Sequence, residues 1–219
     1  MARYKSIHTG PQIDSGVARA LPGGEIDRMR PNRNLLDNWD FRNPINQRRV
    51  VEGTADWNTY FLDRWLGQCT YAITAGSLSL AAGSYIVQKR ESAPPFPCTL
   101  SVLLADGTIL SNTFTGIGGE TVPGYGVFDI EDTFIAINNA NSVEIKAIKL
   151  EVGSISTLAN DPPADYGAEL AKCKRYFNIW ASEEARTAAL LEVGAMRTTP
   201  VVSTLDIGGV TYYAASADL

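Results

Sequence analysis

Between Asn34 and Gly153 the chain consists of short apolar runs separated by turn residues, with no helical pattern between them. Such runs are typical of β-strands. Parallel strands need long crossover connections, usually helices, so this region favours an antiparallel sandwich or barrel over a parallel α/β sheet. The runs are TYAIT, SYIVQKR, TLSVLLADGTILSNTF, VFDIEDTFIAI and SVEIKAIKLEV.

Two local patterns within this region predict finer structure. The stretch Ala-Asp-Gly-Thr at 105–108 predicts a tight hairpin, because Asp-Gly readily adopts the positive φ angles of such turns. In SVEIKAIKLEV, apolar and charged residues alternate with one slip in phase. A strand with one solvated face and a β-bulge would produce this pattern.

A short amphipathic helix is expected near the N-terminus. Ile13, Val17 and Leu21 are spaced four residues apart, behind a possible Thr9 cap and with Pro11 in the first turn. A helix of this length is marginal alone in water, so its apolar stripe needs the body of the protein or other copies of itself. We therefore expect residues 1–30 to form a helical arm for trimerisation or attachment.

The C-terminal region, residues 161–219, is expected to contain one helix followed by β-strands. In DYGAELAKCKRYF, four residues fall on one stripe and predict an amphipathic helix with one buried face. The β pattern returns from Thr199 to Leu219, with a hairpin turn expected at Ile207-Gly208-Gly209-Val210. The residues of the helical stripe are Tyr166, Leu170, Cys173 and Phe177.

The composition is that of a folded soluble protein: 45% of the residues are hydrophobic and 20% are charged. A formal net charge of -5 without a basic face argues against nucleic-acid binding. The start MARYKSIHTG has no apolar core of a signal peptide, and no window is apolar enough for a spanning helix. We therefore expect neither membrane insertion nor signal-peptide export. The three cysteines, Cys69, Cys98 and Cys173, are expected to be reduced, partly buried thiols.

The chain offers few groups for catalysis. His8 is its one histidine, which argues against Ser-His-Asp, Cys-His and His-rich metal sites, so no cofactor and no metal are expected. Paired carboxylates remain, because Asp129, Glu131 and Asp132 lie close together in FDIEDTF. In one extended strand Asp129 and Glu131 would share a face, with Asp132 opposite, as glycoside hydrolysis could use. A solvated strand edge is the preferred interpretation of these acidic residues.

The aromatic residues indicate a binding surface. Trp39 and Trp65, set among other apolar residues, are expected in the core. Trp57 lies in a polar stretch, and Tyr125 lies in the Gly- and Pro-rich segment GIGGETVPGYG, which is expected to be a surface loop. Exposed aromatic rings can stack on sugars while polar side chains bind the hydroxyl groups. We therefore predict that Trp57 and Tyr125 contribute to a shallow glycan-binding surface.

Three further stretches form a recognisable set by their order and spacing: NLLDNWDFRNPINQR at 34–48, YFLDRW at 60–65, and IKAIKLEVGSISTLANDPPADYGAELAKCKRYF at 145–177. Together they resemble a family of tail-fibre and related virion proteins of bacteriophages and prophages. The resemblance implies a jelly-roll β-sandwich similar to carbohydrate-binding modules, over residues 31–160, and usually a homotrimer. In the same motifs Asp63, Arg64 and Trp65 are expected to be scaffold, with Arg64 pairing with Asp63 or Asp37. The chain departs from the family pattern at Arg49, where glycine is frequent.

The resemblance further implies a tail-fibre or receptor-binding component of a virion, made in the cytoplasm of the host bacterium. Its expected partners are other copies of itself, other phage tail proteins and a bacterial surface glycan. Two alternatives stay open. One is a tail enzyme that degrades polysaccharide with paired carboxylates, and the other is a structural tail adaptor that does not touch the host.

Overall fold

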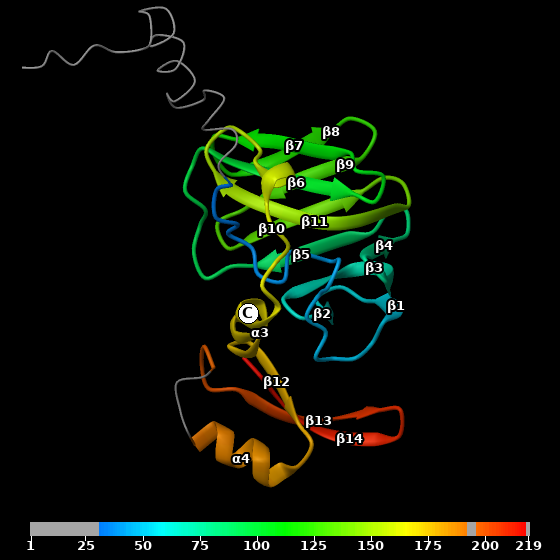
Figure 1. Ribbon diagram of the computed structural model, residues 1–219, viewed down its shortest axis with the longest axis vertical. Helices are drawn as coiled ribbons and strands as arrows, with labels where there is room; N and C mark the ends of the chain where they lie inside the picture. Colours follow the sequence, from blue (N-terminus) through cyan, green and yellow to red (C-terminus); the bar gives the residue numbers. More distant parts are fainter. Residues whose placement is uncertain (1–30, 192–195, 218–219) are drawn as a thin grey trace, which may run out of the picture.

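A computed structural model describes residues 31–191 and 196–217 of the chain. The predicted helical arm of residues 1–30, with Ile13, Val17 and Leu21, lies outside the described residues. The described part is mainly β and antiparallel, as predicted (Figure 1). Its strands are β1 (Glu52–Ala55), β2 (Tyr60–Leu62), β3 (Trp65–Thr74), β4 (Ser77–Leu80), β5 (Tyr85–Lys89), β6 (Cys98–Leu104), β7 (Ile109–Phe114), β8 (Gly118–Val122), β9 (Gly126–Ile130), β10 (Phe134–Asn139), β11 (Val143–Val152), β12 (Phe177–Trp180), β13 (Val201–Ile207) and β14 (Val210–Ser216).

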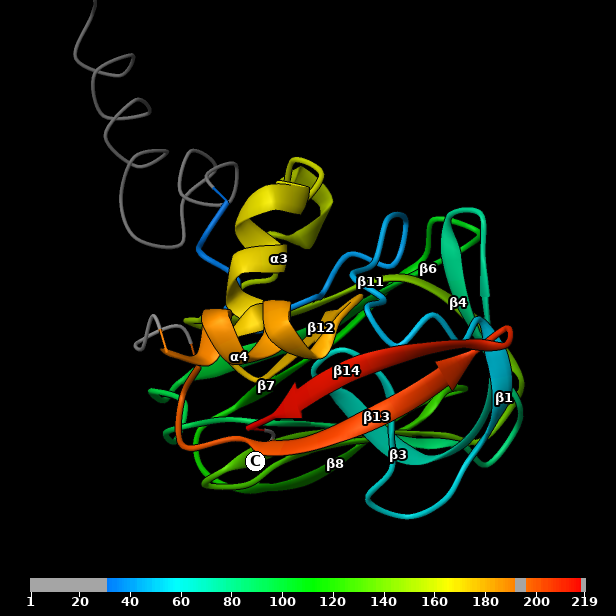
Figure 2. The same cartoon turned by 90° about the horizontal axis from the view of Figure 1, so that it is seen from below.

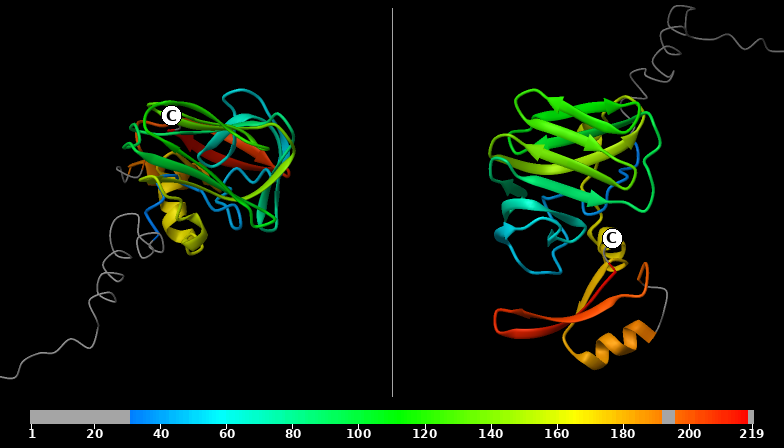
Figure 3. Two further views of the ribbon diagram at one scale, coloured as in Figure 1. Left: turned by 90° about the horizontal axis from the view of Figure 1, so that it is seen from above. Right: turned by 180° about the vertical axis from the view of Figure 1, so that it is seen from behind.

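The strands β1 to β11 form one sheet folded into two layers. The strand order is β7-β6-β11-β4-β3-β5-β10-β9-β8, and β1 and β2 also pair with β3. The long strand β3 joins the layers, because its first half pairs with β5 and its second half with β4. Seen from above, the two layers face each other as in a sandwich (Figure 3, left). This architecture confirms the predicted antiparallel, jelly-roll-like sandwich.

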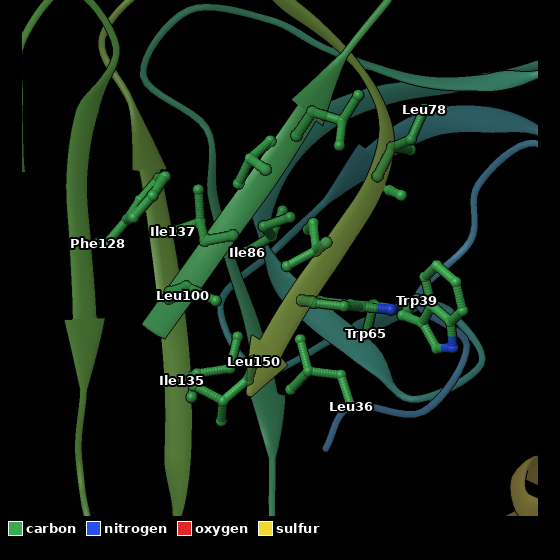
Figure 4. Packing of buried hydrophobic residues seen from close by; sticks show 14 of the residues in the cluster. Leu36, Trp39, Trp65, Leu78, Ile86, Leu100, Phe128, Ile135, Ile137 and Leu150 are labelled. Atoms are coloured by element: carbon green, nitrogen blue, oxygen red, sulfur yellow. The ribbon is translucent and has the colours of Figure 1, made fainter. Parts of the chain in front are cut away.

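The core fills the space between the two layers. Leu100 of β6 and Leu150 of β11 point from one layer toward Ile86 of β5 and Ile137 of β10 in the other (Figure 4). Because successive side chains of a strand point to opposite faces, each strand places every second residue in this core. Trp39 and Trp65 are 7% and 0% exposed, which confirms their predicted burial.

The predicted turn and bulge of the sandwich are confirmed. Asp106 and Gly107 form the turn between β6 and β7, with Gly107 at φ 91°. The phase slip in β11 is a β-bulge, since the pairing register with β6 shifts between Ile145 and Ala147.

The solvated face predicted for β11, by contrast, is wrong. Lys149 and Glu151 are both 0% exposed, because Lys149 donates to Asp161 and Glu151 accepts from the Thr157 hydroxyl.

The segment before β1, residues 34–49, lies beside β11 and connects several parts of the sandwich through hydrogen bonds. The amide Nδ2 of Asn38 donates to the carbonyl oxygens of Ile45 (2.9 Å) and Asp63 (2.7 Å), and its Oδ1 accepts from the Ile45 N–H (2.7 Å). The indole N–H of Trp65 donates to the carbonyl oxygen of Asn38 (2.9 Å). Asn38 is buried and has φ 50°, a conformation that asparagine tolerates better than most residues. This segment is scaffold.

The end of the chain forms a second, smaller sheet at one end of the sandwich (Figures 1 and 2). Its strand order is β12-β14-β13, and the predicted turn at Gly208 and Gly209 joins β13 to β14. A short helix η1 (Leu158–Asn160) and helix α3 (Tyr166–Lys174) connect the two sheets. Helix α4 (Glu183–Leu191), which we did not predict from the sequence, lies against β12 and β14.

Helix α3 confirms the predicted amphipathic helix but not all of its stripe. Cys173 is buried, whereas Tyr166 is 46% exposed, and the helix ends at Lys174 so that Phe177 belongs to β12. The face of α3 that is buried also contains Glu169, whose carboxylate accepts the N–H of Asn38 (2.7 Å). The apolar residues alone therefore predicted Leu170 for the buried face of α3, where the structure has its neighbour Glu169.

Three cysteines are buried and free, as expected for reduced thiols: Cys69, Cys98 and Cys173. Burial raises the pKa of the Cys69 thiol to about 12, so that thiol stays protonated at neutral pH. Among the residues that the structure describes, no helix is both long and apolar enough to cross a membrane.

Candidate functional site

The outer face of the layer β3-β5-β10-β9-β8 presents a row of residues in register across four of its strands. Leu66 of β3 pairs with Val87 of β5, which pairs with Ala136 of β10, which pairs with Asp129 of β9. Because side chains alternate along each strand, the neighbours Tyr85 and Lys89 of Val87 on β5 share this outer face. The row is apolar on one side and acidic at Asp129.

Trp57 covers the apolar side of this face. It lies in the turn between β1 and β2 and is 60% exposed, which confirms its predicted exposure. Its indole ring stacks on the ring of Tyr85, with centroids 5.0 Å apart and planes inclined by 14°. Since Tyr85 covers one face of the indole and most of the residue stays exposed, the other face is available to a ligand.

Trp57, Tyr85 and Phe134 surround a hollow of about 100 Å³, and we call these three residues the aromatic platform. Leu66 and Val87 lie beneath them and are only 3% and 6% exposed. Isolated apolar side chains on a protein surface are common, but a cluster of aromatic rings around a hollow is typical of binding sites.

Gly67 in β3 allows the strands below the aromatic platform to approach closely. A Cβ atom at position 67 would lie 2.0 Å from the carbonyl oxygen of Tyr85, far inside van der Waals contact. Any side chain at this position would push β3 away from β5. The glycine therefore lets β3 pair closely with β5, the strand that carries Tyr85.

Polar groups lie around the aromatic platform. Lys89 lines the same hollow, and Asn138 of β10, which pairs with Tyr85, is exposed. Burial and then the negative charges of Asp129 and Glu131 raise the pKa of Tyr85. Tyr85 therefore keeps its hydroxyl proton at neutral pH and can donate a hydrogen bond. One carboxylate oxygen of Asp129, Oδ1, is buried without a hydrogen-bond partner.

The three acidic residues of FDIEDTF do not lie in one strand. Asp129 belongs to β9, which ends at Ile130, while Glu131 and Asp132 lie in the turn before β10. The single extended strand that we assumed for them is therefore wrong, because a tight β9-β10 hairpin interrupts it. Across the described ranges 31–191 and 196–217, no cluster of three or more His, Cys, Asp or Glu could hold a metal ion.

Tyr125 is a correction to the sequence-based prediction. It is 4% exposed, and its ring packs edge-on against Phe128 at a centroid distance of 5.5 Å. The segment we expected to be a loop contains β8 at Gly118–Val122, and the β8-β9 turn folds Tyr125 back onto the end of the core. Tyr125 therefore lies under the surface, and a ligand cannot stack on it as it can on Trp57.

No protein-family model, curated protein or solved structure matches this chain.

Sequence reasoning identified Trp57 but missed Tyr85 and Phe134. A usable signal was present in SYIVQKR, where strand alternation places Tyr85, Val87 and Lys89 on one face and Ile86 on the other. The pairing of this strand with β10, which adds Phe134 opposite Lys89, depends on strand order.

Proposed function

We propose that this chain is a virion protein of a bacteriophage tail, a fibre or receptor-binding component that attaches to the surface of a bacterium through glycans. Three sequence motifs that resemble those of phage and prophage tail-fibre proteins support the proposal. A rigid antiparallel sandwich also suits a protein that presents a surface to a partner rather than enclosing a substrate.

The single observation that supports glycan binding most directly is the aromatic platform. Trp57 is stacked on Tyr85 and 60% exposed, so its position is held by the sheet while one face of its indole remains accessible. The apolar face of a sugar ring stacks on such a surface, and the hydroxyl groups around the ring require polar partners. Lys89, Asn138 and Asp129 provide charged and amide groups on the same sheet face.

The hollow at the aromatic platform is small, so one site would bind weakly. Several linked sites increase the effective concentration of ligand, and a homotrimer would provide three of them. We propose that the chain is a homotrimer held in part by Ile13, Val17 and Leu21. Light scattering of the full chain and of a chain lacking residues 1–30 tests this, and a full-length monomer at micromolar concentration would contradict it.

The binding proposal is tested with the full-length chain and three variants in a pull-down on whole bacterial cells and on a glycan array. We expect Trp57→Ala to lose most of the binding and Trp57→Phe to keep part of it, because phenylalanine retains a flat apolar ring. Tyr166→Ala, which removes another exposed aromatic residue from α3, is the matched control and is expected to bind like the wild type. Unchanged binding of Trp57→Ala would contradict the proposal.

The same samples separate the two alternative functions. A tail enzyme would release reducing ends from purified capsule or wall polysaccharide, and that release would fall in Asp129→Asn. A structural adaptor would bind no cell and no glycan in any form of the chain. Both results differ from the saturable, non-hydrolytic binding that we expect.

A further inference from the structure

A second pocket, of about 270 Å³, lies where the sandwich meets the segment between α3 and β12. Arg64, in the turn before β3, and Arg90, after β5, line it together with Arg33 and Tyr176, and we call it the arginine pocket. Lys89 and Val87 on β5 point to the aromatic platform, whereas Gln88 between them lines the arginine pocket. The two sites therefore lie on opposite sides of β5.

Arg64 is almost completely buried, with 2% of its side chain exposed. Its Nη2 donates to the carbonyl oxygen of Lys89 (2.6 Å), and its Nε donates to the carboxylate of Asp37 (3.2 Å). The guanidinium lies over the ring of Tyr176, 3.4 Å from the ring centre. Its remaining nitrogen, Nη1, is buried and has no hydrogen-bond partner.

A buried guanidinium nitrogen without a hydrogen-bond partner raises the free energy of the folded state. A buried charged donor without a partner loses its hydration and receives no hydrogen bond in exchange. Arginine cannot avoid this cost by losing its proton. The position of Arg64 is fixed by the Lys89 carbonyl, Asp37 and Tyr176. Its Nη1 lacks an acceptor, which the chain itself does not supply.

Arg90 repeats this feature at the same pocket. Its Nη1 is also buried without a hydrogen-bond partner. Burial lowers the pKa of Arg90, and the negative charge of Asp37 offsets only part of that effect. Two arginines that line one pocket therefore each carry a buried N–H group without a hydrogen-bond partner.

The two acidic residues of the pocket already have hydrogen-bond or ion-pair partners. Glu91 accepts a hydrogen bond from the Tyr176 hydroxyl (2.7 Å) and forms ion pairs with Arg175 (3.2 Å) and Arg197 (3.5 Å). The Tyr176 hydrogen bond, followed by the charges of the surrounding arginines, lowers the pKa of Glu91, which stays ionised. Asp37 is paired with Arg64 through Nε.

The lining as a whole is electropositive. Three arginines, Arg33, Arg64 and Arg90, stand against the two carboxylates of Asp37 and Glu91, and Glu91 has two further arginines of its own. A water molecule could accept a hydrogen bond from one Nη1 group but would leave the excess positive charge. An oxyanion would satisfy both requirements, since guanidinium groups bind carboxylates and phosphates through paired N–H groups.

We propose that the arginine pocket binds a small oxyanion, the carboxylate of an acidic sugar or a phosphate group, through Arg64 and Arg90. A volume of about 270 Å³ admits one such group or one monosaccharide unit, and the exposed Arg33 lies at the entrance. This site is independent of the aromatic platform, and the chain would have two places that recognise different chemical groups.

Isothermal titration of the full chain at constant ionic strength tests the proposal with glucuronate, inorganic phosphate and neutral glucose. We expect saturable binding of glucuronate or phosphate and none of glucose. Arg90→Met, which keeps the aliphatic stem and removes the charge, is expected to weaken anion binding about tenfold or more. Tighter binding of glucuronate would assign the pocket to acidic sugars, and tighter binding of phosphate to phosphate groups.

Two controls and a second pocket variant make the result decisive. Arg186→Met removes an arginine of α4, outside the pocket, and is expected to bind anions like the wild type. Arg33→Gln tests the entrance if Arg90→Met does not fold, and we expect weaker binding there too. Trp57→Ala is expected to bind the anions normally, so failure of the glycan platform and failure of this pocket are distinguishable. No saturable oxyanion binding, or equal binding in Arg90→Met and wild type, would overturn the proposal.

Discussion

The indole ring of Trp57 lies nearly parallel to the phenol ring of Tyr85, with their centroids 5.0 Å apart. One residue comes from the turn between β1 and β2 and the other begins β5. The stack fixes an otherwise exposed tryptophan on the outer face of the sheet. Preorganised aromatic surfaces of this kind lose little conformational entropy when a ligand stacks on them.

Trp57 and Trp65 should differ sharply in their effect on stability. Trp65 is fully buried, so Trp65→Ala should lower the free energy of unfolding by about 3–5 kcal/mol, as large-to-small core substitutions do. Trp57→Ala removes mainly exposed surface and one ring contact, so we expect a loss of no more than about 1 kcal/mol. Chemical denaturation of both variants measures the difference, and similar losses would contradict the placement of the two rings.

Asn38 should stabilise the fold through its side-chain hydrogen bonds rather than through its backbone conformation. Asn38 and Asn58 both have positive φ, 50° and 63°, so glycine fits the backbone at either position. Asn38→Gly removes three buried hydrogen bonds and should cost about 2–4 kcal/mol. Asn58→Gly, in an exposed turn, should change the free energy of unfolding by less than about 0.5 kcal/mol. Equal effects of the two substitutions in urea denaturation would refute this assignment.

Asp40 should contribute to the loss of stability in acid. Burial by itself would raise its pKa, but the Arg42 side chain (2.7 Å) and the Ala164 N–H (3.0 Å) donate to the carboxylate, and the net result is a lowered pKa. The ionised form is therefore favoured in the folded state. Its contribution is complete above the unfolded-state pKa of about 3.9 and is lost as the pH falls through the lower folded-state value.

Asp40→Asn should therefore lower the free energy of unfolding by about 1–3 kcal/mol at neutral pH, with a difference from wild type that shrinks below about pH 4. Denaturation at a series of pH values measures this difference. Asp132→Asn, which removes an exposed carboxylate in the β9-β10 turn, is the control with the same change of charge. If the difference in free energy of unfolding between Asp40→Asn and wild type stayed constant at acidic pH, the ionised carboxylate would not be the source of the stabilisation.

Gly67 should be essential for the pairing of β3 with β5. Gly67→Ala places a Cβ atom 2.0 Å from the Tyr85 carbonyl oxygen, so the strands must separate or the chain must fail to fold. We expect a large loss of thermal stability, measured by thermal denaturation. Gly116→Ala is the control, because no heavy atom lies within 4 Å of its added Cβ. A Gly67→Ala protein as stable as Gly116→Ala would contradict the observed strand separation.

Much of the fold could be predicted because its signals are local. Strand alternation and the Asp106-Gly107 turn depend on backbone conformation within a few residues, and the phase slip marked the bulge near Ala147 without any knowledge of the partner strand. Helix α4 was missed although it is as long as the predicted helix α3, with 9 residues each, and although Ser182, whose Oγ accepts the Ala185 N–H, was an available N-cap signal.

The binding surfaces were less predictable because burial depends on neighbours from distant parts of the chain. Tyr125, in a Gly- and Pro-rich segment, is buried by a turn that folds back over the core, whereas Trp57, in a polar stretch, remains exposed. No local composition distinguishes these two outcomes. Arg64 and Arg90 similarly meet Tyr176, which is more distant in the chain, only because α3 packs against the end of the sandwich.

The sequence by itself determined that this chain forms antiparallel strands with one set of faces buried, since alternation and turn chemistry act over a few residues. Only the tertiary structure decided which aromatic rings face outward and which arginines share a pocket. The physical reason is that exposure and electrostatic pairing are properties of the packed surface, to which segments far apart in the chain contribute together.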